Sequence, residues 1–211
     1  MKAIPFYYDD YDDLFANTYV LIDDNSHCIV IDPSKDYDGI SSYIKKNNLI
    51  LKAILLTHGH FDHIRGVKRL IDEYSVPLYV GFDEVDLLTN PRLNCSKYMS
   101  EEYVLDVKPV TLSDNEILRI MDEDILCIST PFHTFGSMCF YLKDSKLLFT
   151  GDFLFKGSVG RSDLPTGTPK TFNDSIRKIL SLPDDVKIYP GHGPSSNIKL
   201  EKEINPFIKS L

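Results

Sequence analysis

The sequence predicts a layered α/β sandwich, and three observations lead to this fold class. The chain has 211 residues, which is enough for one well-buried core. Its apolar, strand-like segments gather in two successive halves, and each half also contains helical segments. Strands and helices do not simply alternate, which disfavours a parallel doubly wound sheet. We therefore expect a single domain over residues 1–211.

The first half opens with a β-hairpin. The apolar segments 17–22 and 27–32 are typical of strands, and the polar cluster 23–26 between them is typical of a tight turn. Residues 40–47 have the spacing of a short amphipathic helix. A short apolar run at 52–57 then predicts a buried strand.

The next segments predict a helix over 64–74, a strand over 76–80 and a helical stretch over 82–88. The apolar residues of the first helix recur at helical spacing. Pro77 suits an edge strand or the start of a strand. The polar stretch 89–94 predicts a surface loop, of the kind that often borders a binding site.

The second half is mostly strand. We expect strands at 117–120, 125–128, 138–142, 147–150 and 186–189, with helices at 171–182 and at 201–211, the latter interrupted at Pro206. The turn at 143–146 joins two of these strands as a hairpin.

Composition and charge limit the possible partners and compartments. The formal net charge of −8 argues against binding to nucleic acid, which normally requires a basic patch. Residues 1–13 lack the features of a signal peptide, and no apolar run is as long as a membrane span. We therefore expect a cytoplasmic protein that acts on a small molecule.

Cys28, Cys127 and Cys139 lie in apolar runs and are expected in the core, whereas Cys95, in a polar stretch, could be exposed.

The run from Thr57 to His63 contains three histidines and one aspartate within six positions, namely His58, His60, Asp62 and His63. Neutral imidazoles and carboxylates are the usual ligands of hydrolytic transition metals. In an extended strand end, residues two apart point to the same side, while Asp62 and His63 project from the turn that starts a helix. Two sub-clusters suit two metal ions. The alternative is a loop of solvated histidines beside a helix-capping Asp62.

Three further motifs place a His or Asp in a Gly- or Pro-marked turn after an apolar strand, at His133, Asp152 and His192. Five of the six histidines fall in these strand-end motifs, and only His27 is expected to face solvent. Together the motifs offer five imidazoles and two carboxylates, which is enough for two metals with open positions for water or substrate.

The order H-x-H-x-D-H, followed by His, Asp and His after successive strands, resembles the metallo-β-lactamase superfamily of hydrolases. Residues 160–165, 189–194 and 205–207 are most similar to bacterial hydroxyacylglutathione hydrolase (glyoxalase II)-like proteins. The resemblance spans nearly the whole chain, including Asp32 in the opening hairpin. It implies an α+β fold, a four-layer αββα sandwich of two mixed sheets with helices outside. It also implies the ligands of two divalent metals: His58, His60 and His133 for the first, Asp62, His63 and His192 for the second, and Asp152 bridging both.

Two departures from the family concern the substrate. The family often has Gly where this chain has Phe132, and Pro where it has Phe135. We therefore expect these two aromatic side chains to reshape the pocket. Full-length glyoxalase II enzymes also carry a C-terminal helical domain that binds glutathione, and we do not carry glutathione recognition over to this chain. Arg161 is a further pocket candidate, although an ion pair with Asp163 within the same turn is favoured.

The leading functional hypothesis is a binuclear zinc hydrolase of thioesters or related acyl compounds, in which Fe or Mn would also fit. The metals would supply hydroxide as the nucleophile, and Asp62 would orient it. The main alternative is a persulfide dioxygenase with one iron at His58, His133 and Asp152. A nuclease is disfavoured by the acidic charge. A non-enzymatic metal-binding protein is disfavoured because no ligand is missing.

Overall fold

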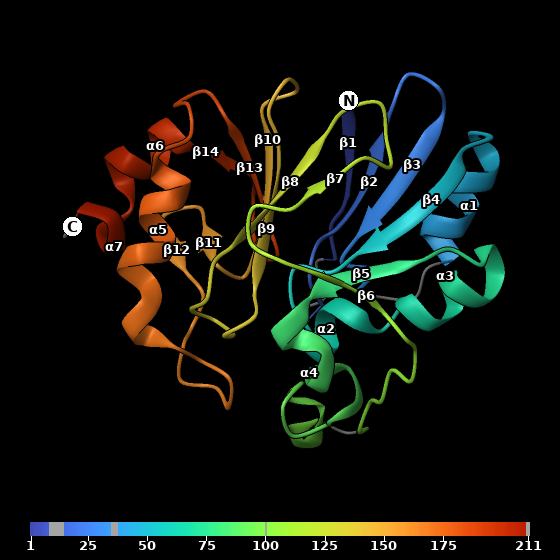
Figure 1. Cartoon of the computed structure of the whole chain (residues 1–211), viewed down its shortest axis with the longest axis horizontal. Helices are drawn as coiled ribbons and strands as arrows, with labels where there is room; N and C mark the ends of the chain where they lie inside the picture. The colour runs from blue at the N-terminus through green and yellow to red at the C-terminus, as the bar shows by residue number, and fades with distance from the viewer. Residues whose placement is uncertain (9–14, 35–37, 100, 210–211) are drawn as a thin grey trace.

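The fold is a four-layer sandwich in which two six-stranded β-sheets pack face to face and helices cover both outer faces (Figure 1). The computed structural model describes residues 1–8, 15–34, 38–99 and 101–209. Each sheet contains both parallel and antiparallel neighbours. The αββα architecture with two mixed sheets is therefore confirmed.

The first sheet contains β1 to β6, in that order across the sheet. The strands are β1 (Lys2–Phe6), β2 (Thr18–Ile22), β3 (His27–Ile31), β4 (Ile50–Leu55), β5 (Leu78–Gly81) and β6 (Val110–Leu112). The first three are antiparallel neighbours, whereas β3 to β6 run parallel. Two helices, α1 (Asp38–Lys46) and α3 (Val67–Tyr74), pack their apolar faces against the outer side of this sheet.

The second sheet has the order β14-β13-β10-β9-β8-β7. The strands are β7 (Ile117–Leu118), β8 (Ile125–Ser129), β9 (Met138–Leu142), β10 (Leu147–Gly151), β13 (Lys187–Pro190) and β14 (Ser196–Asn197). Its outer side is covered by α5 (Phe172–Leu180), α6 (Ile198–Ile204) and α7 (Pro206–Lys209). A separate small hairpin is formed by β11 (Leu154–Phe155) and β12 (Ser158–Val159).

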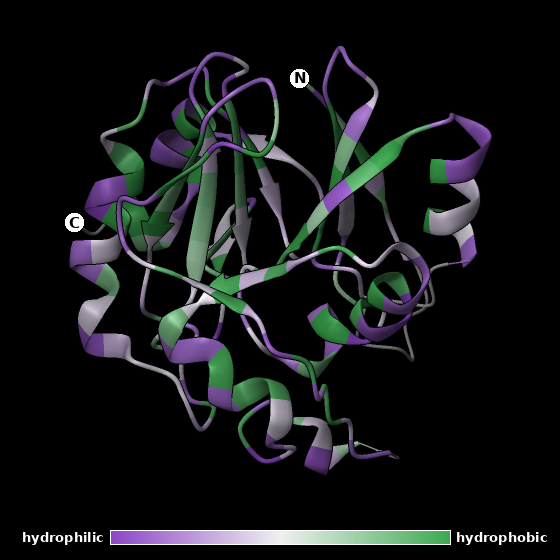
Figure 2. Cartoon of the chain, turned by 45° about the vertical axis from the view of Figure 1, so that its right-hand side comes forward, coloured by the Kyte–Doolittle hydropathy of each residue, from purple (hydrophilic) through white to green (hydrophobic). Residues whose placement is uncertain are grey.

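The alternation of side chains along the strands builds the core on both faces of each sheet. In β9, Met138, Phe140 and Leu142 point into the cluster between the two sheets. Cys139 and Tyr141, on the other face, pack towards the helices. Burying a large apolar side chain contributes about 1.5–3 kcal/mol relative to leaving it exposed. Along the helices, hydrophobic residues alternate with hydrophilic ones, as the coloured bands on their ribbons show (Figure 2).

One edge of the sandwich collects the ends of several strands. The short helices α2 (Phe61–Ile64) and α4 (Val85–Thr89) lie along this edge, below the sheets in Figure 1. Residues 56–60 lead from β4, which is parallel to both of its neighbours, into α2. None of the described helices combines the length and the apolar composition needed to cross a bilayer.

The expected helix over 64–74 is divided into two. The first turn, α2, begins at Phe61, and the chain turns at Arg65 and Gly66 before α3 begins. The N–H of Gly66 donates to the carbonyl of Pro33 at 2.7 Å, outside the helix. The apolar spacing over 64–74 gave no sign of this contact, because it comes from a segment distant in sequence.

Several other boundaries differ from the expected ones. The strands β1, β6, β11, β12 and β14 were not predicted; most are very short, and β1 carries Pro5 at the sheet edge. The last helical segment begins at Ile198 rather than at residue 201, and residues 210–211 lie outside the described part of the chain. The expected interruption at Pro206 is confirmed, because α6 and α7 meet there.

The suggestion that Cys95 could be exposed is wrong, because its side chain is buried like those of the other three cysteines. The carbonyl of Asn94 accepts the backbone N–H of Phe61 at 2.9 Å. This bond holds the polar segment against α2. Residues 89–94 do form the predicted loop, apart from the end of α4 at Thr89.

Candidate metal centre

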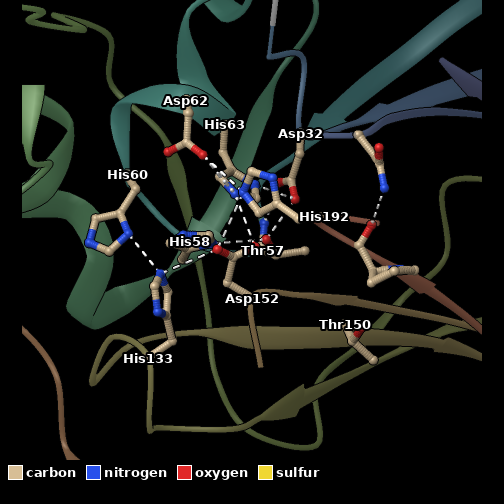
Figure 3. Close-up of polar contacts among 12 residues, drawn as sticks. Asp32, Thr57, His58, His60, Asp62, His63, His133, Thr150, Asp152 and His192 are labelled. Atoms are coloured by element: carbon tan, nitrogen blue, oxygen red, sulfur yellow. Dashed lines mark hydrogen bonds and ion pairs between the residues drawn. The ribbon is translucent and has the colours of Figure 1, made fainter. Parts of the chain in front are cut away.

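The structure brings together the side chains of all seven predicted metal ligands at one edge of the sandwich (Figure 3). They come from both halves of the chain: His58 and His60 follow β4, Asp62 and His63 lie on α2, His133 follows β8, Asp152 follows β10, and His192 follows β13. All of these side chains are buried except that of His192, which is about one-third exposed. The strand-end motifs therefore converge as the sequence predicted.

The first group consists of His58, His60 and His133, whose ring nitrogens lie within 4.8 Å of one another. The Nδ1 of His60 is 2.9 Å from the Nε2 of His133. The ring of His58 lies edge-on to both, with centroid distances of 4.8 and 4.9 Å. Two nitrogens that share one tetrahedral ion lie about 3.4 Å apart, so the three imidazoles could hold a single ion with little movement.

The second group consists of Asp62, His63 and His192. The Oδ2 of Asp62 is 3.1 Å from the Nε2 of His192 and 3.6 Å from the Nε2 of His63. These separations are again those of donors that could share one ion. This group therefore has two imidazoles and one carboxylate directed at a common point.

Asp152 lies between the two groups. Its Oδ1 is 3.3 Å from the Nε2 of His63, and its Oδ2 is 3.5 Å from the Nε2 of both His133 and His192. One carboxylate oxygen therefore contacts a histidine from each group. This is the position that a carboxylate bridging two ions would take.

The hydrogen bonding of these residues fits a metal site. Among the described residues, the Nε2 atoms of His58 and His63 and the Oδ1 of Asp152 are buried without any hydrogen bond. Leaving a buried polar atom unpaired costs about 1–3 kcal/mol. Imidazole nitrogen and carboxylate oxygen are ligands suited to Zn²⁺, Fe and Mn. A divalent ion would provide the missing partner for these atoms.

Two histidines of the first group, His58 and His60, are poised to bind as neutral ligands. Burial, together with the neighbouring imidazoles, holds the pKa of His58 well below its ordinary value. Burial likewise lowers the pKa of His60 to about 3. Because metal competes with protons for imidazole nitrogen, a low pKa favours the metal.

The second group lies in a strongly negative field. Burial alone would lower the pKa of His63, but the carboxylates of Asp62, Asp32 and Asp152 outweigh it and raise this pKa well above its ordinary value. Burial would raise the pKa of Asp152, but His192 and His63 hold it well below the usual range. A divalent cation would neutralise the same field.

Asp32 orients two of the histidines. It accepts the backbone N–H of Thr57 at 2.8 Å and the Thr57 hydroxyl at 2.6 Å. Since the hydroxyl proton is thereby committed, the Thr57 oxygen can only accept from the Nδ1 of His58, 3.2 Å away. The Nδ1 of His63 lies 2.9 Å from the Oδ2 of Asp32. Both imidazoles therefore present Nε2 to the centre, as outer-shell partners of metal ligands commonly arrange.

The backbone of Arg161 orients a third histidine, because its carbonyl accepts the Nδ1–H of His133 at 2.6 Å. The guanidinium of Arg161 donates to both carboxylate oxygens of Asp163, at 2.6 and 2.7 Å. The expected internal ion pair is confirmed. The remaining histidine, His27, lies outside the centre and contacts Asp23 at 3.1 Å.

The loop that carries His192 depends on a close approach at Gly191. A Cβ at this position would lie 2.2 Å from the Oδ1 of Asp152, closer than side-chain carbons are found. The amide of Asn17 fixes the same loop by donating to the carbonyls of Pro190 at 3.0 Å and Gly193 at 2.9 Å. Asn17, directly before β2, thereby fixes the loop that carries His192, near the other end of the chain.

A cavity of about 500 Å³ opens directly onto the centre. Its polar side is formed by His60, Asp62, His133, Asp152 and His192, and its other walls by Phe61, Cys95, Tyr98, Met99, Phe155, Gly160, Arg161 and Leu164. The walls are mostly apolar, and Tyr98 and Met99 expose 63% and 39% of their surface. Arg161, which the sequence suggested as a pocket residue, lies in the wall of this cavity.

The expectation that Phe132 and Phe135 shape the pocket needs correction. Phe132 is buried against Phe153 and Phe172 beneath the second sheet, with ring centroids 6.1 and 4.8 Å away. Phe135 is 43% exposed, and neither aromatic is among the described residues that line the cavity. Closeness to His133 in the sequence therefore does not place an aromatic side chain in the cavity. The turn that contains His133 directs Phe132 and Phe135 away from it.

Glu84 is a buried acid that the motifs did not reveal. Its carboxylate contacts the backbone on both sides of the centre, at Gly59 and Gly136. Burial raises the pKa of Glu84 to about 7, although its hydrogen bonds act in the opposite direction. A glutamate between other acidic residues, Asp83 and Asp86, gives no sequence signal of such a position.

Comparison with known proteins agrees with this geometry. The family model of the metallo-beta-lactamase superfamily matches residues 11–192. The chain is 36% identical to the "Probable metallo-hydrolase YqgX" of Bacillus subtilis over 93% of each chain. It is 34% identical to the hydroxyacylglutathione hydrolase GloC of Haemophilus influenzae, over 92% of this chain and 93% of that protein.

Two solved structures are also similar. The BLEG-1 B3 metallo-beta-lactamase superposes with a TM-score of 0.91 at 34% identity, covering 98% of this chain and 99% of that one. TTHA1623 in a di-iron-bound form gives a TM-score of 0.83 at 32% identity, covering 97% and 99%. The chain belongs to the metallo-beta-lactamase superfamily, a superfamily of hydrolytic metalloenzymes.

Proposed function

We propose that this protein is a hydrolase of small thioesters that holds two divalent metal ions. His58, His60 and His133 would hold the first ion, and Asp62, His63 and His192 the second. The observation that carries the proposal is the position of Asp152, whose carboxylate lies 3.3–3.5 Å from histidines of both groups. Zn²⁺ is the ion we expect, and Fe or Mn suits the same donors.

The residues of the chain divide the work of hydrolysis. When bound, a pair of divalent ions supplies acidified water and an electrophile for an acyl carbonyl. Asp62 lines the cavity and accepts a hydrogen bond from the attacking water, which orients its lone pair towards the carbonyl. Asp32 keeps His63 directly, and His58 through Thr57, in the tautomer that presents Nε2.

The proposed leaving group follows from Cys95 and Arg161, two residues of the cavity wall that are poor proton donors. A thiol has a pKa of about 8.5, so a thiolate departs without a proton donor, whereas an amide nitrogen requires one. Burial raises the pKa of the Cys95 thiol to about 11, which makes it a poor acid. The guanidinium of Arg161 is already bound to Asp163. The similarity to GloC, a hydroxyacylglutathione hydrolase, supports a thioester further.

The experiment that tests the proposal compares two activities of the purified, metal-containing protein. Thiol release from a panel of small thioesters, including S-lactoylglutathione, is followed with a thiol reagent. Oxygen uptake is followed separately with glutathione persulfide. We expect metal-dependent thiol release without oxygen uptake. Oxygen uptake without thioester turnover would favour the iron dioxygenase instead, and elemental analysis of the same sample identifies the ion.

The apolar walls of the cavity predict a preference among thioesters. Each methylene buried against Tyr98, Met99 or Leu164 contributes about 0.8 kcal/mol, so kcat/KM should rise about fourfold per added methylene until the cavity is filled. Kinetics over a homologous acyl series measure this. Met99→Ser should flatten the dependence, whereas Phe82→Ala, at an exposed aromatic outside the cavity lining, should not. A rate independent of chain length in the unaltered protein would contradict the prediction.

A further inference from the structure

Glu84 joins the two loops that carry the first group of histidines. It ends a short 3-10 helix (Phe82–Glu84) between β5 and α4, and its side chain is completely buried. Its Oε2 accepts the backbone N–H of Gly59 at 2.7 Å, and its Oε1 accepts that of Gly136 at 2.9 Å. A single carboxylate therefore binds two backbone segments that are far apart in sequence.

The two glycines lie in the loops that carry the histidines of the first group. Gly59 separates His58 from His60 in the loop that follows β4 of the first sheet. Gly136 lies three residues after His133, in the turn that joins β8 to β9 of the second sheet. These two loops carry all three histidines of the first group, so the carboxylate joins the same two loops that the ion would join.

Close packing leaves this arrangement little freedom. A Cβ at Gly59 would lie 2.6 Å from the Cβ of Leu87, and one at Gly136 would lie 2.7 Å from the Oε1 of Glu84 itself. Both loops therefore rest directly on the segment that contains Glu84. Movement of the carboxylate would be transmitted to both loops, because no side chain intervenes.

We propose that Glu84 is a positioning residue of the metal centre, which sets the separation of the two histidine loops and thereby the affinity for the ion held by His58, His60 and His133. This inference rests on the proposed metal centre, but it does not depend on a thioester as the substrate. Glu84 acts through the backbone and contacts neither the ion nor the substrate.

The variant Glu84→Gln tests the proposal with little change in volume. An amide oxygen can accept one of the two N–H groups, but the amide nitrogen would face the other as a second donor. Zinc is titrated into metal-free protein against a chromophoric chelator. We expect one of the two binding steps to weaken about 10–100-fold, as is typical when an outer-shell partner is lost, and the other to change less than about threefold. The amide resonances of Gly59 and Gly136 should shift in the metal-free variant.

Glu201→Gln is the matched control. Glu201 is also completely buried, accepts the N–H of Gly157 at 2.9 Å and the amide of Asn205 at 2.9 Å, and contacts none of the metal-centre residues. We expect wild-type affinity for both ions in this variant. An equal loss in Glu201→Gln would show a general effect of losing a buried carboxylate and would overturn the proposal.

Two further outcomes are decisive. Wild-type affinity in Glu84→Gln would overturn the proposal. If that variant does not fold, Glu84→Asp keeps the charge but is too short to reach both N–H groups, and it should weaken the same binding step; unchanged affinity there would also overturn the proposal. Because the titration uses no substrate, its result is independent of the thioester assay. Failure of the unaltered protein to bind zinc, iron or manganese would instead refute the proposed function.

Discussion

Replacing Asp152 with Ala is expected to lower kcat/KM for thioester hydrolysis by at least about 10³-fold, because this carboxylate contacts histidines of both groups. Without it, neither ion has its full set of donors. The pKa of water would then no longer be lowered enough to make hydroxide available at neutral pH. The measurement is thiol release by the variant, together with the metal content of the same preparation, which should fall below one ion per chain.

Asp174→Ala is a suitable control for this result. Asp174 lies in α5, and its side chain is largely exposed and pairs only with Arg177 among the described residues. Its removal should leave both rate and metal content unchanged. Full activity in Asp152→Ala would contradict the bridging role that the account assigns to this carboxylate.

The second large effect is expected for His60→Ala, which should abolish turnover while one ion remains bound. His60 contributes a nitrogen to the first group only, and it lies 2.9 Å from His133 on the cavity side of the centre. The second group consists of Asp62, His63 and His192 and does not include His60. Metal analysis should therefore give close to one ion per chain, and the thiol assay should give only background rates.

His27 provides the histidine control. This partly exposed residue lies at the start of β3, outside the metal centre, and its side chain contacts Asp23. His27→Ala should retain two ions and full activity. Loss of both ions in His60→Ala would show that the two groups bind cooperatively and would contradict the division into separate ligand sets.

The sequence predicted which side chains gather in the candidate metal centre better than it predicted the backbone that carries them. The spacing of His58 and His60 was interpreted as one side of an extended strand end. In the structure β4 ends at Leu55, and the two residues lie in an irregular segment beyond it. Hydrogen bonds from Thr57 to Asp32 and from Gly59 to Glu84 hold that segment. Residue type and strand-end position were therefore enough to predict which side chains gather at one edge of the sandwich, but not the contacts that orient them.

Features that depend on contacts distant in sequence could not be predicted. The division of the helix at Gly66 depends on the carbonyl of Pro33. The burial of Phe132 depends on Phe172, forty residues later in the chain. Hydrophobic periodicity, by contrast, is local, and it identified most of the longer strands and the outer helices within a few residues. The layered architecture followed from those elements and their order.

The most direct test of the account is a titration of thioester turnover with metal. Metal-free protein is prepared with a chelator, and Zn²⁺, Fe²⁺ or Mn²⁺ is added back in measured equivalents while thiol release is recorded. The account predicts no turnover without metal, and a rate that rises until two equivalents are bound and then stays constant. Undiminished turnover by the metal-free protein, or a rate that is complete at one equivalent, would contradict it.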